Sequence, residues 1–281
     1  MNNQNTAPES NQPFKPPVAL ASLSGQSDAE WAKSGSTYAG IAFLGGLAID
    51  EATREAARTM AERERNEFLP ADPVSFVDSQ LDALGDVPIQ AGFNIRTTRL
   101  EPLADVADVC RKYSALLEIN AHCRQDEICS VGGGESLLAD RERLCKQVSV
   151  ANERGVDVSV KVRTEVSGVA LPSLCESLET AGASVIHVDA MDSEHVVADI
   201  AARTSLTIIA NNGVRNRETV FEYLNHGADA VSVGRPSDQP TVLSRVNHAV
   251  NDWYSAKHNR EPIRVVRNTE EDPVRNQCER P

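Results

Sequence analysis

Short apolar runs alternate with longer segments of helical periodicity along most of this chain. The runs are rich in Val, Ile, Leu and Ala, which is typical of buried strands in a parallel sheet. A strand followed by a helix, repeated along the sequence, indicates βα units. We place the strands at Val18–Ser22, Gly40–Leu44, Pro88–Gly92, Leu116–Asn120, Asp157–Val162, Ser184–Val188, Thr207–Ala210 and Ala230–Val233.

Helical periodicity is clearest in the segments between these runs. Gly182 and Gly227 each follow such a segment and precede a strand, in the phrases ETAGASVIHVDA and LNHGADAVSVGR. Glycine is preferred just after a helix, where the backbone turns left-handed, so both are expected to terminate helices. The helical segments are Asp50–Asn66, Pro102–Tyr113, Asp140–Arg154, Leu171–Ala181, Arg217–His226 and Pro240–Trp253.

Eight strands with intervening helices predict an α/β fold of the (β/α)₈ TIM-barrel class, in a single domain. The chain has 281 residues, and a barrel of this kind needs roughly 250. An open doubly wound sheet is the alternative, because a sequence does not reveal the order of its strands. We place the barrel at residues 17–256, between a disordered tail at 1–16 and a polar tail at 257–281.

The overall composition is that of an ordinary globular protein, with 41% hydrophobic and 25% charged residues. No apolar run approaches the roughly 18 residues that a membrane span needs. The polar opening stretch, MNNQNTAPESNQPFKPP, lacks the apolar centre of a secretory signal. We therefore expect a cytoplasmic protein with no membrane partner.

The formal net charge is −13, and the isoelectric point is about 5.0. Such a surface repels nucleic-acid phosphates unless a local basic groove overrides it. High intracellular salt weakens this repulsion, and arginine outnumbers lysine here. The composition is therefore compatible with a halophilic source.

The six cysteines have neither the dense spacing of a disulfide scaffold nor a paired Cys-x-x-Cys motif. We expect reduced thiols and no metal site. Those within helical patterns are expected to lie in or near the core. The cysteines are Cys110, Cys123, Cys129, Cys145, Cys175 and Cys278.

Polar residues follow or end several of the predicted strands. The carboxyl ends of the strands form the active site of a (β/α)₈ barrel, and polar groups buried there cost free energy unless they are satisfied. A bound polar ligand would satisfy them. The candidates are Gln90 on the third strand, Asn120 and Cys123 after the fourth, Lys161 on the fifth, His187 on the sixth, Asn211, Asn212 and Gly213 after the seventh, and Gly234 and Arg235 after the eighth.

The last two of these strand ends predict a phosphate site. The Asn-Asn-Gly and Gly-Arg turns can present backbone N–H groups to a phosphate, and Arg235 adds a positive charge. Barrels of this class commonly hold phosphate at this place. The glycine run at 132–134 has no P-loop Lys-Ser/Thr after it and is expected to be a flexible loop.

Ordinary structural interpretations exist for most of these residues. A lone histidine in an apolar strand, such as His187, is more often a satisfied core residue than a ligand contact. Gly213 and Gly234 can simply permit turns, and a single thiol such as Cys123 is commonly inert. Lys161 is harder to explain in this way, because lysine is almost never fully buried without a partner.

The order of these motifs over residues 90–235 resembles that of the dihydrouridine synthases, flavin enzymes that reduce uridine in transfer RNA. That family has a strand-3 glutamine, an Asn-x-Gly-Cys-Pro loop with a glycine-rich stretch after it, Val-Lys-x-Arg, a strand-6 histidine, Asn-Gly and Gly-Arg. The corresponding segments here are Gln90, NAHCRQ, VGGGESLL, VKVR, His187, NNG and VGR.

The resemblance implies an FMN-dependent oxidoreductase. It places Gln90, Lys161 and His187 around the flavin ring and Asn212, Gly213, Gly234 and Arg235 around the phosphate, and Asn211 is a further cofactor-binding candidate. It implies hydride transfer to C6 of uracil, a proton from Cys123 to C5, and Asn120 as a residue that orients the base. Lys161 would favour the anionic reduced flavin. NADPH or NADH is the expected transient electron donor, and tRNA the expected partner.

Several residues depart from the family pattern. Cys123 stands between His122 and Arg124 instead of Gly and Pro, and the sixth strand reads HVDAM in place of His-x-Arg. Few residues follow Trp253, so an archaeal short form without the family's carboxyl-terminal helical domain is expected. Two alternatives stay open: a dihydroorotate-dehydrogenase-like flavin enzyme for a small molecule, and a flavin-free phosphate-binding barrel.

Overall fold

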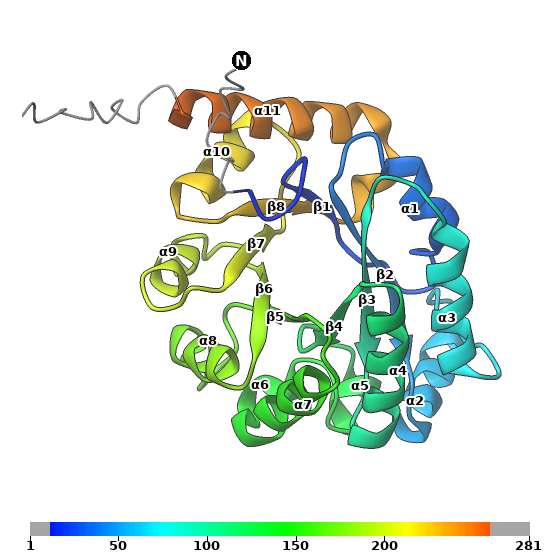
Figure 1. The fold of residues 1–281 in the computed structure, drawn as a ribbon. Coiled ribbons are helices and arrows are strands. Elements are labelled where there is room, and N and C mark those ends of the chain that lie inside the picture. Colours follow the sequence, from blue (N-terminus) through cyan, green and yellow to red (C-terminus); the bar gives the residue numbers. More distant parts are fainter. Residues whose placement is uncertain (1–11, 259–281) are drawn as a thin grey trace, which may run out of the picture.

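The computed structural model describes residues 12–258 of the chain and shows a closed barrel of eight parallel strands in sequential order (Figure 1). Each strand pairs with its neighbours in the sequence, and β1 pairs with β8 to close the ring. The prediction of a (β/α)₈ barrel is therefore confirmed. The strands are β1 (Val18–Leu20), β2 (Ile41–Ala48), β3 (Gln90–Arg96), β4 (Leu116–Asn120), β5 (Val158–Arg163), β6 (Ala183–Asp189), β7 (Thr207–Asn211) and β8 (Ala230–Val233).

The connecting helices surround the strands (Figure 1). They are α1 (Ala29–Gly35), α3 (Pro73–Leu84), α4 (Leu100–Lys112), α7 (Arg141–Glu153), α8 (Leu171–Thr180), α9 (His195–Ala201), α10 (Arg217–Asn225) and α11 (Pro240–His258). Gly182 and Gly227 have positive φ and directly follow the residues that cap the carboxyl ends of α8 and α10, as predicted for helix-terminating glycines.

Additional helices occupy the loops that follow three of the strands. They are α2 (Glu51–Glu62) after β2, α5 (Asp126–Ser130) and α6 (Ser136–Ala139) after β4, and the 3₁₀ helix η1 (Arg235–Asp238) after β8. Helices α2 and α5 pack against each other, and Arg63 pairs with Glu127 across them at 2.5 Å. The loops after β2 and β4 therefore form one structured region on the carboxyl face of the barrel.

The third strand differs from the predicted range. The sequence placed it at Pro88–Gly92, but β3 begins at Gln90 and continues to Arg96. Asn94 and Arg96 interrupt the apolar pattern, although both are buried and hydrogen-bonded inside the protein. Because the prediction relied on apolar residues, it ended the strand before these two polar side chains.

The barrel interior is apolar near the amino ends of the strands. Its buried residues include Ala19, Ile41, Phe43, Leu116, Val185, Ile209 and Ala230, with Phe14 packed against them. A methyl group added at Gly92 would lie 2.5 Å from Phe43, so the close approach of this ring requires glycine at that position. The larger apolar cluster contains both strand and helix residues, as expected where the helices pack on the outside of the barrel.

Most of the two predicted tails, 1–16 and 257–281, lies outside the residues that the structure describes. Residues 1–11 and 259–281 lie outside the described residues, whereas Phe14 packs against the barrel interior. Helix α11 continues to His258, beyond the predicted end at Trp253. None of the helices within residues 12–258 combines the length and the apolar character needed to cross a membrane.

A buried ion pair joins β3 to the segment that follows α2. The Arg96 guanidinium contacts the Glu67 carboxylate and the Gly46 carbonyl, and the two charged side chains are 1% and 0% exposed. Removing one partner of such a pair leaves an uncompensated charge in the interior.

We predict that Glu67→Gln lowers the free energy of unfolding by about 3–5 kcal/mol, because Arg96 loses its counter-charge. Urea unfolding of the purified variant measures the change. Glu62→Gln removes an exposed carboxylate at the end of α2 and is the matched control. An equal loss of stability in both variants would contradict the importance of the pair.

Candidate active site

The inner face of β4, β5 and β6 carries several polar side chains toward the carboxyl ends. The strand register pairs Asn120 with Lys161, and Lys161 with His187. Residues paired in neighbouring strands point to the same face of a sheet. The structure therefore brings together three of the residues that the sequence nominated.

Below this set, the carboxylate of Glu118 is fully buried inside the barrel. Oε1 accepts a hydrogen bond from Asn94 Nδ2 at 2.7 Å, and Oε2 contacts Ser159 Oγ at 3.1 Å and His187 Nδ1 at 2.8 Å. Burial alone would raise the pKa of Glu118, but His187, Lys161 and the Asn94 hydrogen bond outweigh burial and lower it. The carboxylate is therefore kept ionised by its partners.

His187 uses both ring nitrogens within the protein. Nδ1 contacts Glu118, Nε2 contacts Ser232 Oγ at 2.7 Å, and the ring lies 5.3 Å from that of Phe43. Its side chain is completely inaccessible, and burial lowers its pKa. This geometry matches the ordinary interpretation, that of a satisfied core histidine.

Lys161 differs from its neighbours in the contacts of its side-chain amine. The residue is 3% exposed, and no hydrogen bond or ion pair of Nζ is found within residues 12–258. Burial lowers its pKa, while Glu118 and Asp189 act in the opposite direction. Because no partner occupies Nζ in the described residues, this buried amine is available to a ligand.

Asn120 holds the loop that follows β4. Its Nδ2 donates to Asn94 Oδ1 at 2.9 Å, and its Oδ1 accepts the backbone N–H groups of His122 and Cys123 at 3.1 and 2.9 Å. Both ends of the amide are thus used inside the protein. Asn120 therefore contacts the loop directly. Its role in orienting a uracil base stays a prediction.

His122 and Cys123 point in different directions from this loop. His122 Nε2 lies 2.5 Å from Asp189 Oδ2 at the end of β6, whose Oδ1 accepts a hydrogen bond from Asn212 at 2.7 Å. Cys123 instead packs against the apolar cluster of Ala56, Met60 and Ile128, which belongs to α2 and α5. The histidine therefore connects the ends of β4, β6 and β7, and the thiol faces the additional helices.

The turn after β7 and the start of η1 leave open space next to their backbones. Asn212 and Gly213 have φ values of +91° and +67°, and a methyl group added at Gly213 or Gly234 would meet no atom within 4 Å. Arg235 is exposed beside Gly234. Open backbone and an exposed arginine suit a phosphate group, so this end of the predicted FMN site fits its ligand.

Two of the nominated residues have other surroundings. Gln90 is exposed and begins β3, so it lies at the amino end of the barrel, opposite the carboxyl ends that carry Lys161 and Asn212. The family resemblance implies a place beside the flavin ring, and the position of Gln90 at the start of β3 does not support it. Asn211 ends β7, and its carbonyl accepts hydrogen bonds from the Tyr223 hydroxyl and the Ala190 N–H.

Sequence reasoning missed Asn94, Glu118, Ser232 and Asp189. Glu118 and Asn120 alternate with apolar residues in the phrase LLEIN, and this period of two could have shown that both face the barrel interior. Asp189 follows His187 by two residues and could have been placed on the same face by the same reasoning.

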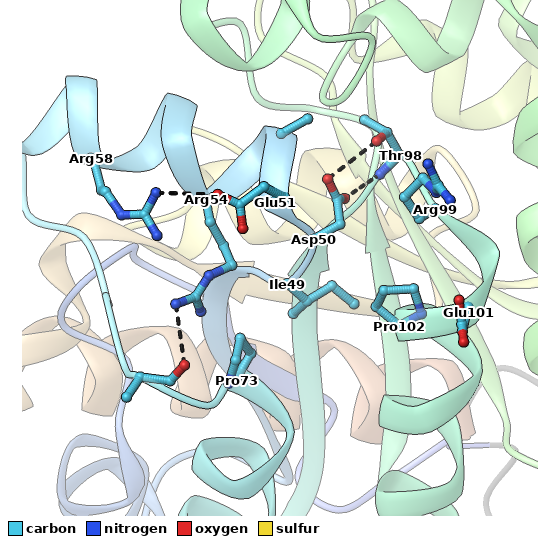
Figure 2. Close-up of a pocket in the computed structure, with 12 residues that line it drawn as sticks. Ile49, Asp50, Glu51, Arg54, Arg58, Pro73, Thr98, Arg99, Glu101 and Pro102 are labelled. Carbon is cyan, nitrogen blue, oxygen red and sulfur yellow. Dashed lines mark hydrogen bonds and ion pairs between the residues drawn. The ribbon is translucent and has the colours of Figure 1, made fainter.

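A pocket of about 770 Å³ also opens on the carboxyl face, where β2 and β3 lead into their loops (Figure 2). Arg54, Arg58 and Arg99 line it together with Asp50, Glu51 and Glu101, so its charges balance. The Asp50 carboxylate accepts hydrogen bonds from Thr97 and Thr98, while Arg54 donates to the Pro70 carbonyl. None of the nominated site residues lines this pocket.

The buried histidine generates a prediction about stability and pH. Because the pKa of His187 is lowered on folding, the unfolded chain binds a proton below about pH 6.5 that the folded protein does not bind. Stability should therefore fall with pH below 6.5. His187→Gln should reduce this slope by up to about 1.4 kcal/mol per pH unit in urea unfolding between pH 7 and 5.

Phe43→Leu is the matched control, because it changes the packing on the imidazole ring without removing a titratable group. It should lower stability by a similar amount at every pH. The same slope in wild type and His187→Gln would contradict the assignment of a neutral buried histidine.

Known proteins resemble this chain in both sequence and fold. An uncharacterised protein of Methanocaldococcus jannaschii is 26% identical over 229 residues, which are 78% of this chain and 88% of that protein. An uncharacterised tRNA-dihydrouridine synthase-like protein of Caenorhabditis elegans is 27% identical over 164 residues, which are 53% and 58% of the two chains.

Among solved structures, a mutant of FabK from Thermotoga maritima shares the fold, with a TM-score of 0.53 and 16% identity over 79% of this chain and 61% of that one. The dihydrouridine synthase family model matches residues 90–272, which is more than half of the chain and includes the β4 loop, Lys161 and the β7 turn. The chain therefore belongs to the dihydrouridine synthase family.

Proposed function

We propose that this protein reduces the C5–C6 double bond of uridine in tRNA with FMN as its cofactor. The observation that carries the proposal is the buried ammonium of Lys161, which has no direct partner within residues 12–258 and lies on the same barrel end as the open turns at Gly213 and Gly234. A buried amine without a hydrogen-bond partner in this part of the chain, on the same barrel end as open backbone, suits a bound polar ligand. The family match supports FMN and uridine over the two alternatives that the sequence left open.

The FMN phosphate is proposed to bind at Asn212, Gly213, Gly234 and Arg235, with Asn211 supporting the turn through its backbone. Lys161 is the residue proposed to contact the flavin ring, where its positive charge favours the anionic reduced form. Bound reduced FMN supplies a hydride to C6 of uracil. His187 contributes by holding Glu118 near Lys161 and makes no direct contact with the ring.

NADPH or NADH is proposed as a transient electron donor. The sequence has no Gly-x-Gly-x-x-Gly fingerprint after a strand, so a dedicated dinucleotide domain is not part of the proposal. The nicotinamide would instead reach the flavin from the open side of the barrel mouth and leave before the RNA binds.

The tRNA partner must bind despite a net charge of −13. Nonspecific affinity for nucleic acid comes mainly from lysine and arginine contacts to phosphates and falls with salt. Arg99 in the pocket of Figure 2 is exposed, and no ion pair of its guanidinium is found in the described part of the chain. It is therefore available to contact an RNA phosphate on the same face as Lys161.

We predict that Arg235→Ala weakens FMN binding about ten- to a hundredfold, since a charge-assisted hydrogen bond contributes roughly 1.5–3 kcal/mol. Fluorescence titration of the apoprotein with FMN measures the dissociation constant. Arg203→Ala is the matched control, because Arg203 is an exposed arginine just before the amino end of β7. Equal affinities in wild type and Arg235→Ala would place the phosphate elsewhere.

We predict that tRNA from a strain lacking this protein has lost dihydrouridine at one or more positions, as measured by mass spectrometry of its nucleosides. The wild-type protein should restore the modification. Lys161→Met should not, because it removes the buried cation, whereas Lys146→Met on the exposed face of α7 should restore it. Unchanged dihydrouridine in the deletion strain would rule out tRNA uridine as the substrate.

A further inference from the structure

His122 is an imidazole at the barrel mouth that the family pattern does not explain. It stands in the loop between β4 and α5, and its side chain is 30% exposed. Nε2 lies 2.5 Å from Asp189 Oδ2, so the ring is directed toward the end of β6. The loop therefore presents a titratable group on the side where Lys161 and Asn212 lie.

The contacts of Asp189 determine which ring nitrogen is available. The hydrogen bonds from His122 and Asn212, together with Lys161, outweigh burial and lower the pKa of Asp189, so it is ionised at neutral pH. Its oxygen must then accept the proton that His122 carries on Nε2. Nδ1 has no hydrogen-bond partner in the described region, and the side chain is 30% exposed. A second proton can therefore be held at Nδ1 and passed to a bound molecule.

Two independent contacts fix this imidazole. Asn120 accepts the backbone N–H of His122 at 3.1 Å, which sets the position of the loop, and Asp189 sets the orientation of the ring. Asp189 is itself held by Asn212, the residue directly before Gly213. The proton-holding group and the proposed phosphate turn are thus connected through one carboxylate.

Cys123 has no comparable arrangement. Its side chain packs against Ala56, Met60 and Ile128, while its carbonyl accepts the Glu135 N–H and contacts Cys129 Sγ. The half-buried thiol packs against residues of the additional helices α2 and α5, and it has no contact with Asp189 within residues 12–258. The geometry favours His122 over Cys123 as the group that reaches a substrate at the barrel mouth.

We propose that His122, positioned by Asp189, donates the proton that completes the reduction of the uracil ring. This inference rests on the proposed function. When a hydride is added at C6, the electron pair of the C5–C6 double bond becomes an enolate conjugated with the C4 carbonyl. The Nδ1–H bond of the imidazolium breaks and its proton bonds to C5, which leaves neutral His122 and a ring reduced by two electrons. Solvent then reprotonates Nδ1.

The charged groups around His122 determine the pH dependence. Burial lowers the pKa of His122, Asp189 from β6 raises it, and Lys161 and Arg163 from β5 lower it, with the net effect a decrease. His187 lies below in the barrel, and its own pKa is lowered. The imidazolium form is therefore lost as pH rises through a value below 6.5. Uridine reduction should slow over that range and lose this dependence in His122→Gln.

The first experiment measures the positioning without turnover. NMR titration of the apoprotein should show an imidazole signal that is missing in His122→Gln and that titrates below pH 6.5. In Asp189→Asn the same signal should titrate at a still lower pH, because the carboxylate that favours the imidazolium is gone. A His122 signal that does not respond to Asp189→Asn would overturn the positioning by Asp189.

The second experiment measures a single turnover of FMN-loaded, prereduced protein with tRNA from the deletion strain. His122→Gln should bind FMN normally and lose about 10²–10⁴-fold in the rate of uridine reduction, the usual contribution of a general acid. His226→Gln, after α10 near the amino end of the barrel, should react at the wild-type rate. A larger loss in Cys123→Ala than in His122→Gln would overturn the proposal and restore the thiol as the donor.

The outcomes also separate this inference from the proposed function. A wild-type protein that reduces no uridine in tRNA would overturn the proposed function and the donor role together. An active wild type with an equally active His122→Gln variant would overturn only the donor role.

Discussion

The carboxylate of Glu118 in the barrel interior imposes the constraint on which the site depends. A buried ionised group is tolerated only when hydrogen bonds and opposite charge compensate the lost hydration. Here Asn94, Ser159 and His187 supply the contacts, and Lys161 supplies charge. These partners come from β3, β5 and β6, so one carboxylate fixes the relative positions of the strands that form the mouth.

The effect of Glu118 extends outward through shared partners. Asn94, held by Glu118, accepts the amide of Asn120, whose oxygen in turn holds the backbone of the next loop. This loop places His122 against Asp189. An interior network of this kind is useful only when all its members are satisfied, since a single unpaired group costs about 1–3 kcal/mol. The chemistry proposed at the mouth therefore depends on residues that never meet a ligand.

The sequence predicts the barrel well because buried parallel strands have a strong apolar signal. Strands β4 and β8 have the predicted bounds, and Lys161 is a buried cation as its strand position indicated. What the sequence does not reveal has one cause. A buried polar residue whose hydrogen-bond partners are far away in the chain looks, in the sequence, like a strand end, a loop residue or a ligand contact. Gln90 was assigned to the mouth because Asn94 and Arg96 hid the rest of β3. For His187 the residue pattern favours a satisfied core histidine, but it does not reveal the partners Glu118 and Ser232, which lie 69 and 45 residues away in the chain.

The conformation of the loop after β4 suits the different polarities of its two consecutive side chains, His122 and Cys123. Asn120 holds the N–H groups of both His122 and Cys123, yet the two side chains contact different groups. One of the two positions packs against the apolar cluster that contains Met60 and Ile128. An imidazole buried there would leave its nitrogens without partners, whereas a thiol behaves as a small apolar group. The cluster thus selects Cys123, and His122 is left on the side where Asp189 binds it.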